Sequence, residues 1–304
     1  MSEVICLASW NADLVSHVAR PIARGETLLA SGFTIGPGGK GSNAAIACTR
    51  QGAQVAVIAR IGDDDFGRMA LALWAREGID ARMVEVVEAE ASGVAQILVY
   101  PDGDNSIAVA PGAGAGLAAR HAHAAAAALG RARVVMASCE VPQAATHAAF
   151  AYAREGGART LLNPAPAQPL PDELLALCDL LTPNETELRL LAGLPASAPA
   201  AAAAQVLLAR GAGAVAVTLG AAGCALFRPD RPALALAGHA VRVADTIGAG
   251  DTFTGAMAAS LARGEPIEAA LAWANAAAAL SVTASGAIPG MPSLDAVRAL
   301  LALR

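Results

Sequence analysis

The chain has 304 residues, of which 55% are hydrophobic and 3% aromatic, and its formal net charge is −5. This length fits one large α/β domain with an appendage, or two domains. The mild acidity offers no basic surface for nucleic acid, and no apolar run of about 20 residues predicts a membrane span.

The cysteines and the start of the chain bear on the compartment. The five cysteines are scattered, odd in number and without metal-ligand spacing. The first residues lack the basic leader of a signal peptide. We therefore expect a cytoplasmic protein with reduced, buried thiols and with neither a nucleic-acid nor a membrane partner.

Short apolar runs alternate with helical stretches along most of the chain. Helices are predicted at 43–51 and 65–78 and after each later run. The runs predicted to be buried strands are 3–9, 54–61, 133–138, 159–162, 179–182 and 214–219. Strands that alternate with helices favour βαβ units, and so an α/β fold with a mostly parallel sheet and helices on both faces.

Two segments break this alternation. Residues 11–36 have few helix signals, and residues 93–110 contain two strand-like runs joined by Pro-Asp-Gly-Asp, a hairpin signal. We predict that 11–36 and 93–110 form a small β lid. The body is then formed by residues 1–10, 37–92 and 111–304. Residues 223–243 also look stranded.

The stretch DTIGAGDTFTGAM (245–257) follows Val241 and Val243, which suggest a strand end, and precedes an apolar helical run. It is therefore predicted to be a strand-to-helix turn with residues 248–251 at the helix N-terminus. There the first N–H groups lack intrahelical partners, and the helix end carries a partial positive charge. Glycines let a phosphate approach the backbone, so the stretch predicts an anion site.

Asp251 is unexpected beside an anion, because a carboxylate repels a phosphate. An acid here is understandable if it accepts the proton of a hydroxyl that attacks phosphorus. The alternative is an ordinary acidic residue in the first turn of a helix. No nucleotide fingerprint competes for the phosphate: GPGGKGS (36–42) lacks the P-loop Lys-Ser/Thr pair, and no G-x-G-x-x-G follows the first strand.

The ordered motifs resemble the ribokinase branch of the ribokinase/PfkB sugar-kinase family. They are GPGGKGSNAAIACTRQGAQVAVIARIGDDDFG (36–67), LNPAPA (162–167), LTPNETE (181–187), VTLGAAG (217–223) and ADTIGAGDTFTGAM (244–257). The resemblance implies a ribokinase-like three-layer αβα sandwich with a small β-sheet lid. It also implies transfer of the γ-phosphate of ATP to a sugar hydroxyl, the 5-hydroxyl of D-ribose, with Mg²⁺ and a monovalent cation, K⁺.

The resemblance also implies roles for individual residues. Asp251 is the general base, and Gly248, Ala249 and Gly250 form the anion hole. The implied sugar contacts are Asn11, Asp13, Gly39, Lys40, Asn43, Glu140 and Asp251, with Gly38 and Gly39 as a hinge. From the residues alone, Asn11 and Asp13 also fit a plain Asx turn, and Glu140 also fits a surface acid.

The nucleotide and metal residues follow in the same way. The implied nucleotide contacts are Asn184, Thr218, Gly220, Gly223 and Asn275. The implied Mg²⁺ contact, through water, is Glu187. An N-capped helix start is the alternative for Asn184 and Glu187, and helix packing is an alternative for Asn275.

The resemblance assigns the monovalent cation to Asp245, Ile247, Ser281, Ala284, Gly286 and Gly290. Three positions depart from the family pattern. Gly290 stands where a serine is frequent, and Ala284 replaces a frequent arginine, although carbonyl ligation tolerates any side chain. Trp10 replaces a smaller residue beside the sugar site, where it could narrow the pocket or stack on a ring.

Other functions stay open at this stage. A sibling PfkB-type kinase could act on another sugar or on a nucleoside, and a non-catalytic sugar- or nucleotide-binding protein would keep the lid but lose the base. An NAD-linked oxidoreductase lacks its dinucleotide fingerprint. Because exposed lid edges need cover, we also expect a homodimer that pairs through the lid.

Overall fold

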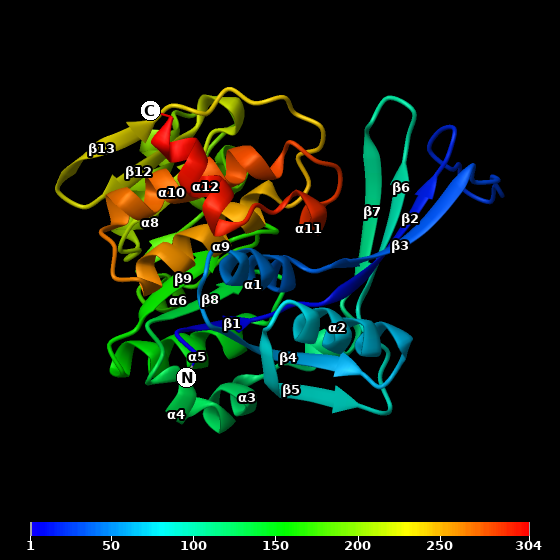
Figure 1. Cartoon of the computed structure of the whole chain (residues 1–304), viewed down its shortest axis with the longest axis horizontal. Helices are drawn as coiled ribbons and strands as arrows, with labels where there is room; N and C mark the ends of the chain where they lie inside the picture. The colour runs from blue at the N-terminus through cyan, green and yellow to red at the C-terminus, as the bar shows by residue number, and fades with distance from the viewer. Residues whose placement is uncertain (1, 304) are drawn as a thin grey trace.

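Two sheets organise the chain, and the computed structural model describes residues 2–303 of it (Figure 1). Within this range the larger sheet has nine strands in the order β13-β12-β11-β10-β9-β8-β1-β4-β5. In chain order these are β1 (Val4–Leu7), β4 (Val55–Gly62), β5 (Asp80–Val87), β8 (Val134–Ser138), β9 (Arg159–Asn163), β10 (Leu180–Leu181), β11 (Val215–Thr218), β12 (Cys224–Arg228) and β13 (Arg231–Leu236). The pairs from β5 to β11 are parallel, and β12 and β13 extend the sheet as antiparallel strands.

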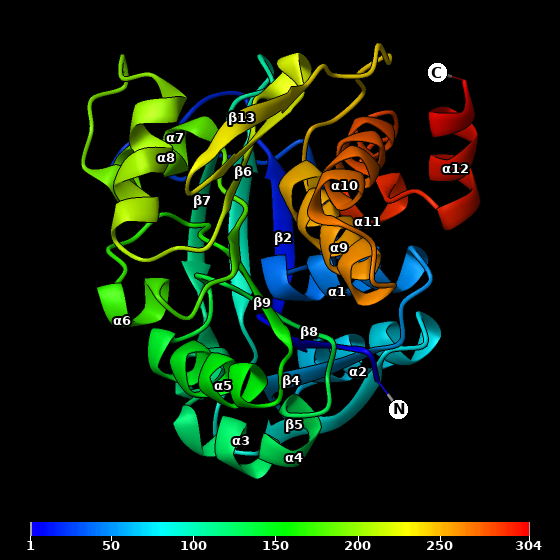
Figure 2. The same ribbon diagram turned by 90° about the vertical axis from the view of Figure 1, so that its left-hand side faces the viewer.

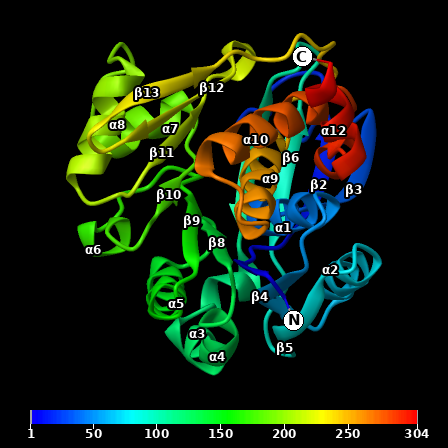
Figure 3. The same cartoon turned by 60° about the vertical axis from the view of Figure 1, so that its left-hand side comes forward.

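Helices cover both faces of this sheet, which confirms the α/β prediction (Figures 2 and 3). One face carries α1 (Lys40–Arg50), α2 (Asp65–Arg76), α9 (Ala249–Ala262), α10 (Ile267–Ser281), α11 (Ala287–Gly290) and α12 (Leu294–Ala302). The opposite face carries α3 (Ala119–Ala124), α4 (Ala126–Leu129), α5 (Gln143–Glu155), α6 (Asp172–Leu175), α7 (Glu185–Ala192) and α8 (Ala200–Ala209). Two short 3₁₀ turns, η1 (Gly112–Gly116) and η2 (Gly220–Ala222), join these elements.

The central strand β1 shows why its sequence is a continuous apolar run. Val4 and Cys6 belong to the core on the α1–α9 face, whereas Ile5 and Leu7 belong to the core on the α5 face. All four side chains are at most 1% exposed. A parallel strand covered on both faces needs apolar residues at every position rather than alternating polarity.

The smaller sheet has the strand order β3-β2-β6-β7 and stands beside the body (Figure 1). Its strands are β2 (Asn11–His17), β3 (Gly32–Gly38), β6 (Val94–Val99) and β7 (Asn105–Ala110). β6 and β7 form the expected antiparallel hairpin. The register places Leu14 opposite Ile35 and Asp13 opposite Gly36. Because successive side chains point to opposite faces, Asp13 lies on one face of this sheet, and Leu14 and Ile35 lie on the other.

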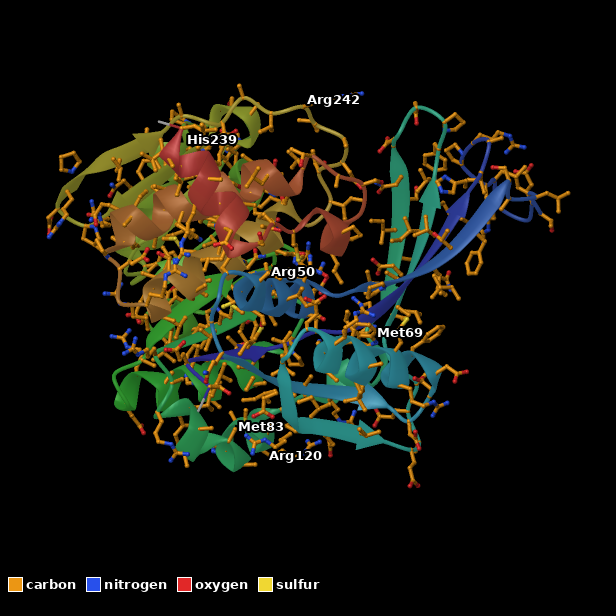
Figure 4. The ribbon with its side chains drawn as sticks, viewed as in Figure 1. Arg50, Met69, Met83, Arg120, His239 and Arg242 are labelled. Atoms are coloured by element: carbon orange, nitrogen blue, oxygen red, sulfur yellow. The ribbon has the colours of Figure 1, made fainter. Side chains whose placement is uncertain are left out.

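The strand predicted to end at residue 243 is wrong beyond Leu236, where β13 ends. Residues 237–248 form an irregular connection, on which Figure 4 labels His239 and Arg242. The reason is that β13 is the edge strand and the chain leaves the sheet there. The N–H of Ala244 instead donates to the carbonyl of Val282, after α10. The strand signal of Val241 and Val243 therefore corresponds to no strand pairing, and Val243 is exposed.

The α1–α9 pair is packed closely, because one glycine lets the two backbones approach. A Cβ on Gly255 of α9 would lie 2.3 Å from the carbonyl oxygen of Ala44 and 2.8 Å from the Cβ of Ala47, both on α1. This contact places the first turn of α9 beside the first turn of α1. It therefore fixes the relative position of the residues that these two turns carry.

Gly255→Ala should destabilise the protein by about 1–3 kcal/mol, because overpacking forces two helix backbones apart. Equilibrium urea unfolding measures this change. Gly36→Ala is the matched control, since a Cβ there meets nothing within 4 Å, and it should leave the midpoint nearly unchanged. Equal stability of Gly255→Ala and the wild type would contradict the packing argument.

Candidate active site

The carboxyl ends of three adjacent strands meet the N-terminus of α9. β9 ends in Asn163, Thr182 directly follows β10, and β11 ends in Thr218. With Asp251 and the first residues of α9, these side chains line a cavity of about 180 Å³, called here the inner cavity. Clefts at the carboxyl ends of parallel strands are where open α/β sheets bind ligands.

The inner cavity brings together residues from five separate sequence motifs. The residues singled out from the sequence that line it are Lys40, Asn184, Glu187, Thr218, Gly248, Ala249, Gly250 and Asp251. The residues that sequence reasoning missed are Asn163, Ala165, Thr182 and Thr246. The cavity is therefore a single place at which the GGKG, NPAP, TPNETE, TLGAAG and GAGD motifs converge.

The N-terminus of α9 is open toward this cavity. The preceding residue, Gly248, has φ 78°, a left-handed conformation that favours glycine, and no side chain caps the helix. A Cβ on Gly250 would meet nothing within 4 Å, so open space adjoins the backbone there. The first-turn N–H groups of a helix have no intrahelical partners. This geometry suits an anion held by main-chain amides.

Asp251 lies in the first turn of α9 and is only 5% exposed. Its Oδ2 accepts a hydrogen bond from Nδ2 of Asn43 at 3.0 Å. Burial raises the pKa of Asp251 to about 6, with smaller contributions from Glu140 and Glu187, although Lys40 and Asn43 oppose the shift. The carboxylate is thus ionised at neutral pH and is a stronger base than an exposed aspartate.

Lys40 begins α1 and supplies positive charge to the cavity. Burial alone would lower the pKa of Lys40, but the carboxylates around it, Asp251 foremost, outweigh this effect and raise it. The N–H of Lys40 donates to Oε2 of Glu140 at 2.8 Å, and Oγ of Ser9 donates to the same oxygen at 2.7 Å. Glu140 therefore ties the start of α1 to the end of β1 and is not a free surface acid.

The paired glycines before Lys40 are required by close backbone approach. A Cβ on Gly38 would lie 2.1 Å from Oδ1 of Asp13, and Gly39 has φ 96° with its Cβ position 2.6 Å from the carbonyl oxygen of Ser9. Burial raises the pKa of Asp13 to about 6, and Glu140 and Asp251 add to this shift. Asp13 thus faces the same group of charges as Asp251, from the small sheet.

Asn11 and Trp10 line a separate pocket of about 230 Å³ together with Glu140. Asn11 is 5% exposed, and its position lies outside the inner cavity. Trp10 is 4% exposed and packs edge-on against Trp74, with ring centroids 5.8 Å apart. Trp10 thus packs in the core and also lines this pocket, and the expectation that it narrows the pocket or stacks on a bound ring stays a prediction.

Asn184 and Glu187 form a reciprocal cap at the start of α7. Oδ1 of Asn184 accepts from the N–H of Glu187 at 2.8 Å, and Oε2 of Glu187 accepts from the N–H of Asn184 at 2.9 Å. Both residues also line the inner cavity. Helix capping and cavity lining therefore coexist here. Glu187 keeps Oε1 for a further partner, such as a metal-bound water.

A larger pocket of about 550 Å³, called here the outer pocket, adjoins the inner cavity and shares Thr218, Thr246, Ala249 and Gly250 with it. Among the residues singled out from the sequence, it also brings together Gly220, Gly223 and Asn275. Nδ2 of Asn275 donates to the carbonyl of Ala237 at 2.9 Å, which fixes the pocket wall. Sequence reasoning missed the apolar wall formed by Val241 and Val243, because an irregular segment has no periodic signal.

The residues assigned to a monovalent cation lie in two neighbouring loops. Asp245 joins these loops, because Oδ1 accepts from the N–H of Ile247 at 2.9 Å and Oδ2 accepts from the N–H of Gly286 at 2.8 Å. A Cβ on Gly290 would lie 2.2 Å from the carbonyl oxygen of Ser281 and 3.6 Å from that of Ala284. Glycine is therefore required at position 290, and the serine that is frequent there would collide.

The described residues lack two features, a cluster of metal-binding side chains and a membrane-spanning helix. Within residues 2–303 no group of three or more His, Cys, Asp or Glu side chains is arranged to hold a metal ion. In the same range, no helix is long and apolar enough to cross a membrane.

Comparison with known proteins relates this geometry to characterised families. The sequence profile described as pfkB family carbohydrate kinase matches residues 1–294. The ribokinase of Haemophilus influenzae is 38% identical over 94% of both chains, and the deoxyribokinase of Salmonella typhi is 33% identical over 99% of both. The structure of Arabidopsis thaliana ribokinase complexed with ribose and ATP superposes with a TM-score of 0.93. It is 31% identical and covers 99% of this chain and 98% of that one.

Asp251→Asn should stabilise the fold at pH 8 by up to about 3 kcal/mol, because the pKa of this carboxyl rises from 3.8 to about 6 on folding. A carboxyl whose pKa is raised by folding adds stability when the pH is below its pKa in the unfolded chain. This stability is lost as the pH rises through its pKa in the folded protein. The advantage of the variant should therefore shrink between pH 6 and pH 4.

Urea unfolding of both proteins across this range measures the difference, which includes the part of the Asp13 pKa shift that the Asp251 charge causes. A stability difference that is independent of pH, or a variant that is less stable at pH 8, would contradict the assignment of the burial effect to Asp251.

Proposed function

The chain belongs to the pfkB family of carbohydrate kinases, and from this premise we propose that it transfers the γ-phosphate of ATP to the 5-hydroxyl of D-ribose. It is an ATP-dependent sugar kinase. The observation that carries the proposal is the buried Asp251, which stands beside an uncapped helix N-terminus where the inner cavity joins the outer pocket. The ribose and ATP in the Arabidopsis complex support the choice of substrates.

In this proposal the sugar lies between the small sheet and the body. The residues that hold its hydroxyls are Asn11, Asp13, Gly39, Lys40, Asn43 and Glu140. Asp251 accepts the proton of the attacking hydroxyl, and the main-chain amides of Gly248, Ala249 and Gly250 stabilise charge on the transferred group. With a pKa of about 6, Asp251 is ionised at neutral pH and close to the range in which a general base works best.

ATP occupies the outer pocket with its terminal phosphate in the inner cavity. Thr218, Gly220, Gly223 and Asn275 line the part for the nucleoside, and Asn184 lies near the phosphates. Glu187 would hold Mg²⁺ through water, since one of its oxygens is engaged in the cap of α7. When bound, this ion neutralises charge on the phosphates.

A monovalent cation, K⁺, fits the loop cluster beside α9. The carbonyl oxygens of Ser281 and Ala284 lie near Gly290, and glycine at this position keeps a side chain away from them. The assigned ligands are Asp245 and the main chain of Ile247, Ser281, Ala284, Gly286 and Gly290. Both oxygens of Asp245 already accept N–H groups, so the carbonyls supply most of the coordination.

The small sheet, residues 11–36 and 93–110, is proposed to act as a lid over the sugar and as a dimer interface. The face with Asp13 looks toward the charges of the site. On the opposite face, Phe33 and Ile35 are 57% and 51% exposed. Exposed apolar residues on a free sheet face favour association.

The five buried cysteines, all free in the described chain, support a reducing compartment, the cytoplasm.

A second acceptor deserves the same test, because the deoxyribokinase of Salmonella typhi is 33% identical to this chain. Deoxyribose lacks the 2-hydroxyl, so the two sugars differ by one hydrogen-bonding group. A site built to pair that hydroxyl rejects the sugar that lacks it, because buried polar groups are left unpaired. The ratio of kcat/KM for the two pentoses therefore decides between them.

Asp251→Asn should lower kcat by about 10²- to 10⁴-fold, the usual contribution of general-base catalysis, while ATP binding is retained. A coupled ADP-release assay with Mg²⁺ and K⁺, run across pentoses, hexoses and nucleosides, measures turnover and acceptor preference. In the wild type, kcat/KM should fall on the acidic side of its pH profile with a midpoint near pH 6. Turnover of the variant within a few-fold of the wild type would exclude Asp251 as the base, and preference for a nucleoside would exclude a pentose kinase.

The dimer proposal predicts that Ile35→Asp shifts the chain from dimer to monomer in sedimentation-velocity experiments, because a charge would be buried in an apolar interface. Thr34→Asp is the matched control: Thr34 neighbours Ile35 on β3, but its side chain points to the opposite face. A wild type that sediments as a monomer at micromolar concentration would contradict the proposal.

A further inference from the structure

Asn163 is a buried asparagine to which the proposed function assigns no role. It ends β9, is 4% exposed and lines the inner cavity. Its Nδ2 lies 3.5 Å from Oδ1 of Asp251, while Nδ2 of Asn43 lies 3.0 Å from Oδ2. The carboxylate of Asp251 thus stands between two carboxamides, one facing each of its oxygens.

We propose that Asn163 is a positioning residue for phosphoryl transfer, which acts with Asn43 to hold the Asp251 carboxylate in one orientation toward the acceptor hydroxyl. This inference rests on the proposed role of Asp251 as the general base. In that step the hydroxyl proton passes to the carboxylate. The oxygen–phosphorus bond to the sugar forms, and the bond from the γ-phosphorus to the bridging oxygen of ADP breaks.

The backbone of Asn163 is fixed by the large sheet. It pairs with Ser138 in the parallel register of β8 and β9, and its carbonyl accepts from the N–H of Cys139 at 3.1 Å. Asn43, by contrast, belongs to α1 on one face of that sheet. The two amides therefore reach the carboxylate from different layers. Any rotation of the first turn of α9 would break one contact or the other.

A carboxamide is chemically suited to this task. It donates a hydrogen bond without carrying charge, so it orients the base at every working pH without lowering the basicity of the carboxylate as strongly as a second cation would. The Asn163 contact is long at 3.5 Å. Catalytic hydrogen bonds are often long in unliganded sites and tighten when the substrates bind.

The competing explanation is that Asn163 only satisfies its own buried amide. A second polar contact between strand ends and α9 allows this to be tested. Oγ1 of Thr182, after β10, lies 2.9 Å from Oγ1 of Thr254, which stands one helical turn beyond Asp251. This pair joins the same two layers but does not touch the carboxylate. Thr254→Val is therefore a matched control for loss of a buried polar contact.

Other groups also act on Asp251 and must stay unchanged between the variants. Lys40 opposes the rise in the pKa of Asp251, while Glu140 and Glu187 add to it. Asp13 and Cys6 face the same carboxylate from β2 and β1. Neither Asn163 nor Thr254 carries a charge, so alanine or valine at these positions leaves this charge set intact.

Asn163→Ala should lower kcat by about 10-fold and move the acidic limb of kcat/KM up by about one pH unit. Loss of a hydrogen bond to the charged form raises the pKa of a carboxyl, and a change of one pKa unit, or tenfold, corresponds to about 1.4 kcal/mol. The isosteric Asn163→Asp should move the limb further, because it places a like charge beside the base. KM for ATP should stay within two-fold in both variants, and Thr254→Val should leave the limb in place.

The decisive measurement is the pH profile of kcat/KM for the sugar. If Asn163→Ala and Asn163→Asp both keep the wild-type limb and kcat within two-fold, the inference is wrong. Infrared titration of the Asp251 carboxyl gives a readout that needs no turnover. Its signal is the difference between each protein and the same protein with Asp251→Asn. It should show the same upward shift in Asn163→Ala, and an unchanged titration would also overturn the inference.

Failure of the proposed function looks different. In that case the wild type phosphorylates no sugar, or Asp251→Asn stays active, whatever residue stands at position 163. If Asn163→Ala does not fold, as shown by its thermal melt, Asn163→Leu carries the test, because it keeps nearly the shape of asparagine and removes the amide without adding a charge. The acidic limb should then move up as expected for Asn163→Ala.

Discussion

Close packing of α1 against α9 is the constraint on which the whole site depends. α1 begins with Lys40 and carries Asn43 in its first turn, and α9 carries Asp251 in its first turn. The two helices approach because Gly255 has no Cβ to meet the carbonyl of Ala44. One helix–helix contact thus brings the Lys40 ammonium, the Asn43 amide and the Asp251 carboxylate together, although Asn43 and Asp251 are 208 residues apart in sequence.

The sheet supplies the other half of the site. Adjacent parallel strands end at the same edge, so Asn163, Thr182 and Thr218 face the N-terminus of α9 without any loop having to place them. Side chains on a rigid sheet are held more precisely than those on loops. The small sheet contributes Asp13, whose carboxylate lies against the Cβ position of Gly38.

The sequence predicted those parts of the site that are encoded locally. The GAGD turn, the helix start after Pro183 and the β6–β7 hairpin each follow from neighbouring residues, and the structure has all three. What it could not predict depends on distant partners. The valines before Asp245 looked stranded because β propensity carries no information on whether a partner strand exists. Asn163 reads as an ordinary strand end until folding places it beside a residue 88 positions away.

The burial of Asp251 sets a balance that the surrounding residues maintain. A solvent-exposed aspartate with a pKa near 4 is ionised but is a weak base, and a fully isolated buried one would hold its proton at neutral pH. Burial raises the pKa of Asp251, and Lys40 and Asn43 hold this rise to about 6. The rest of α9, buried from Thr252 to Ala262, anchors the helix, while its first turn holds the buried carboxylate. The basicity of Asp251 is therefore a property of how the helix is packed, and no single neighbouring residue sets it.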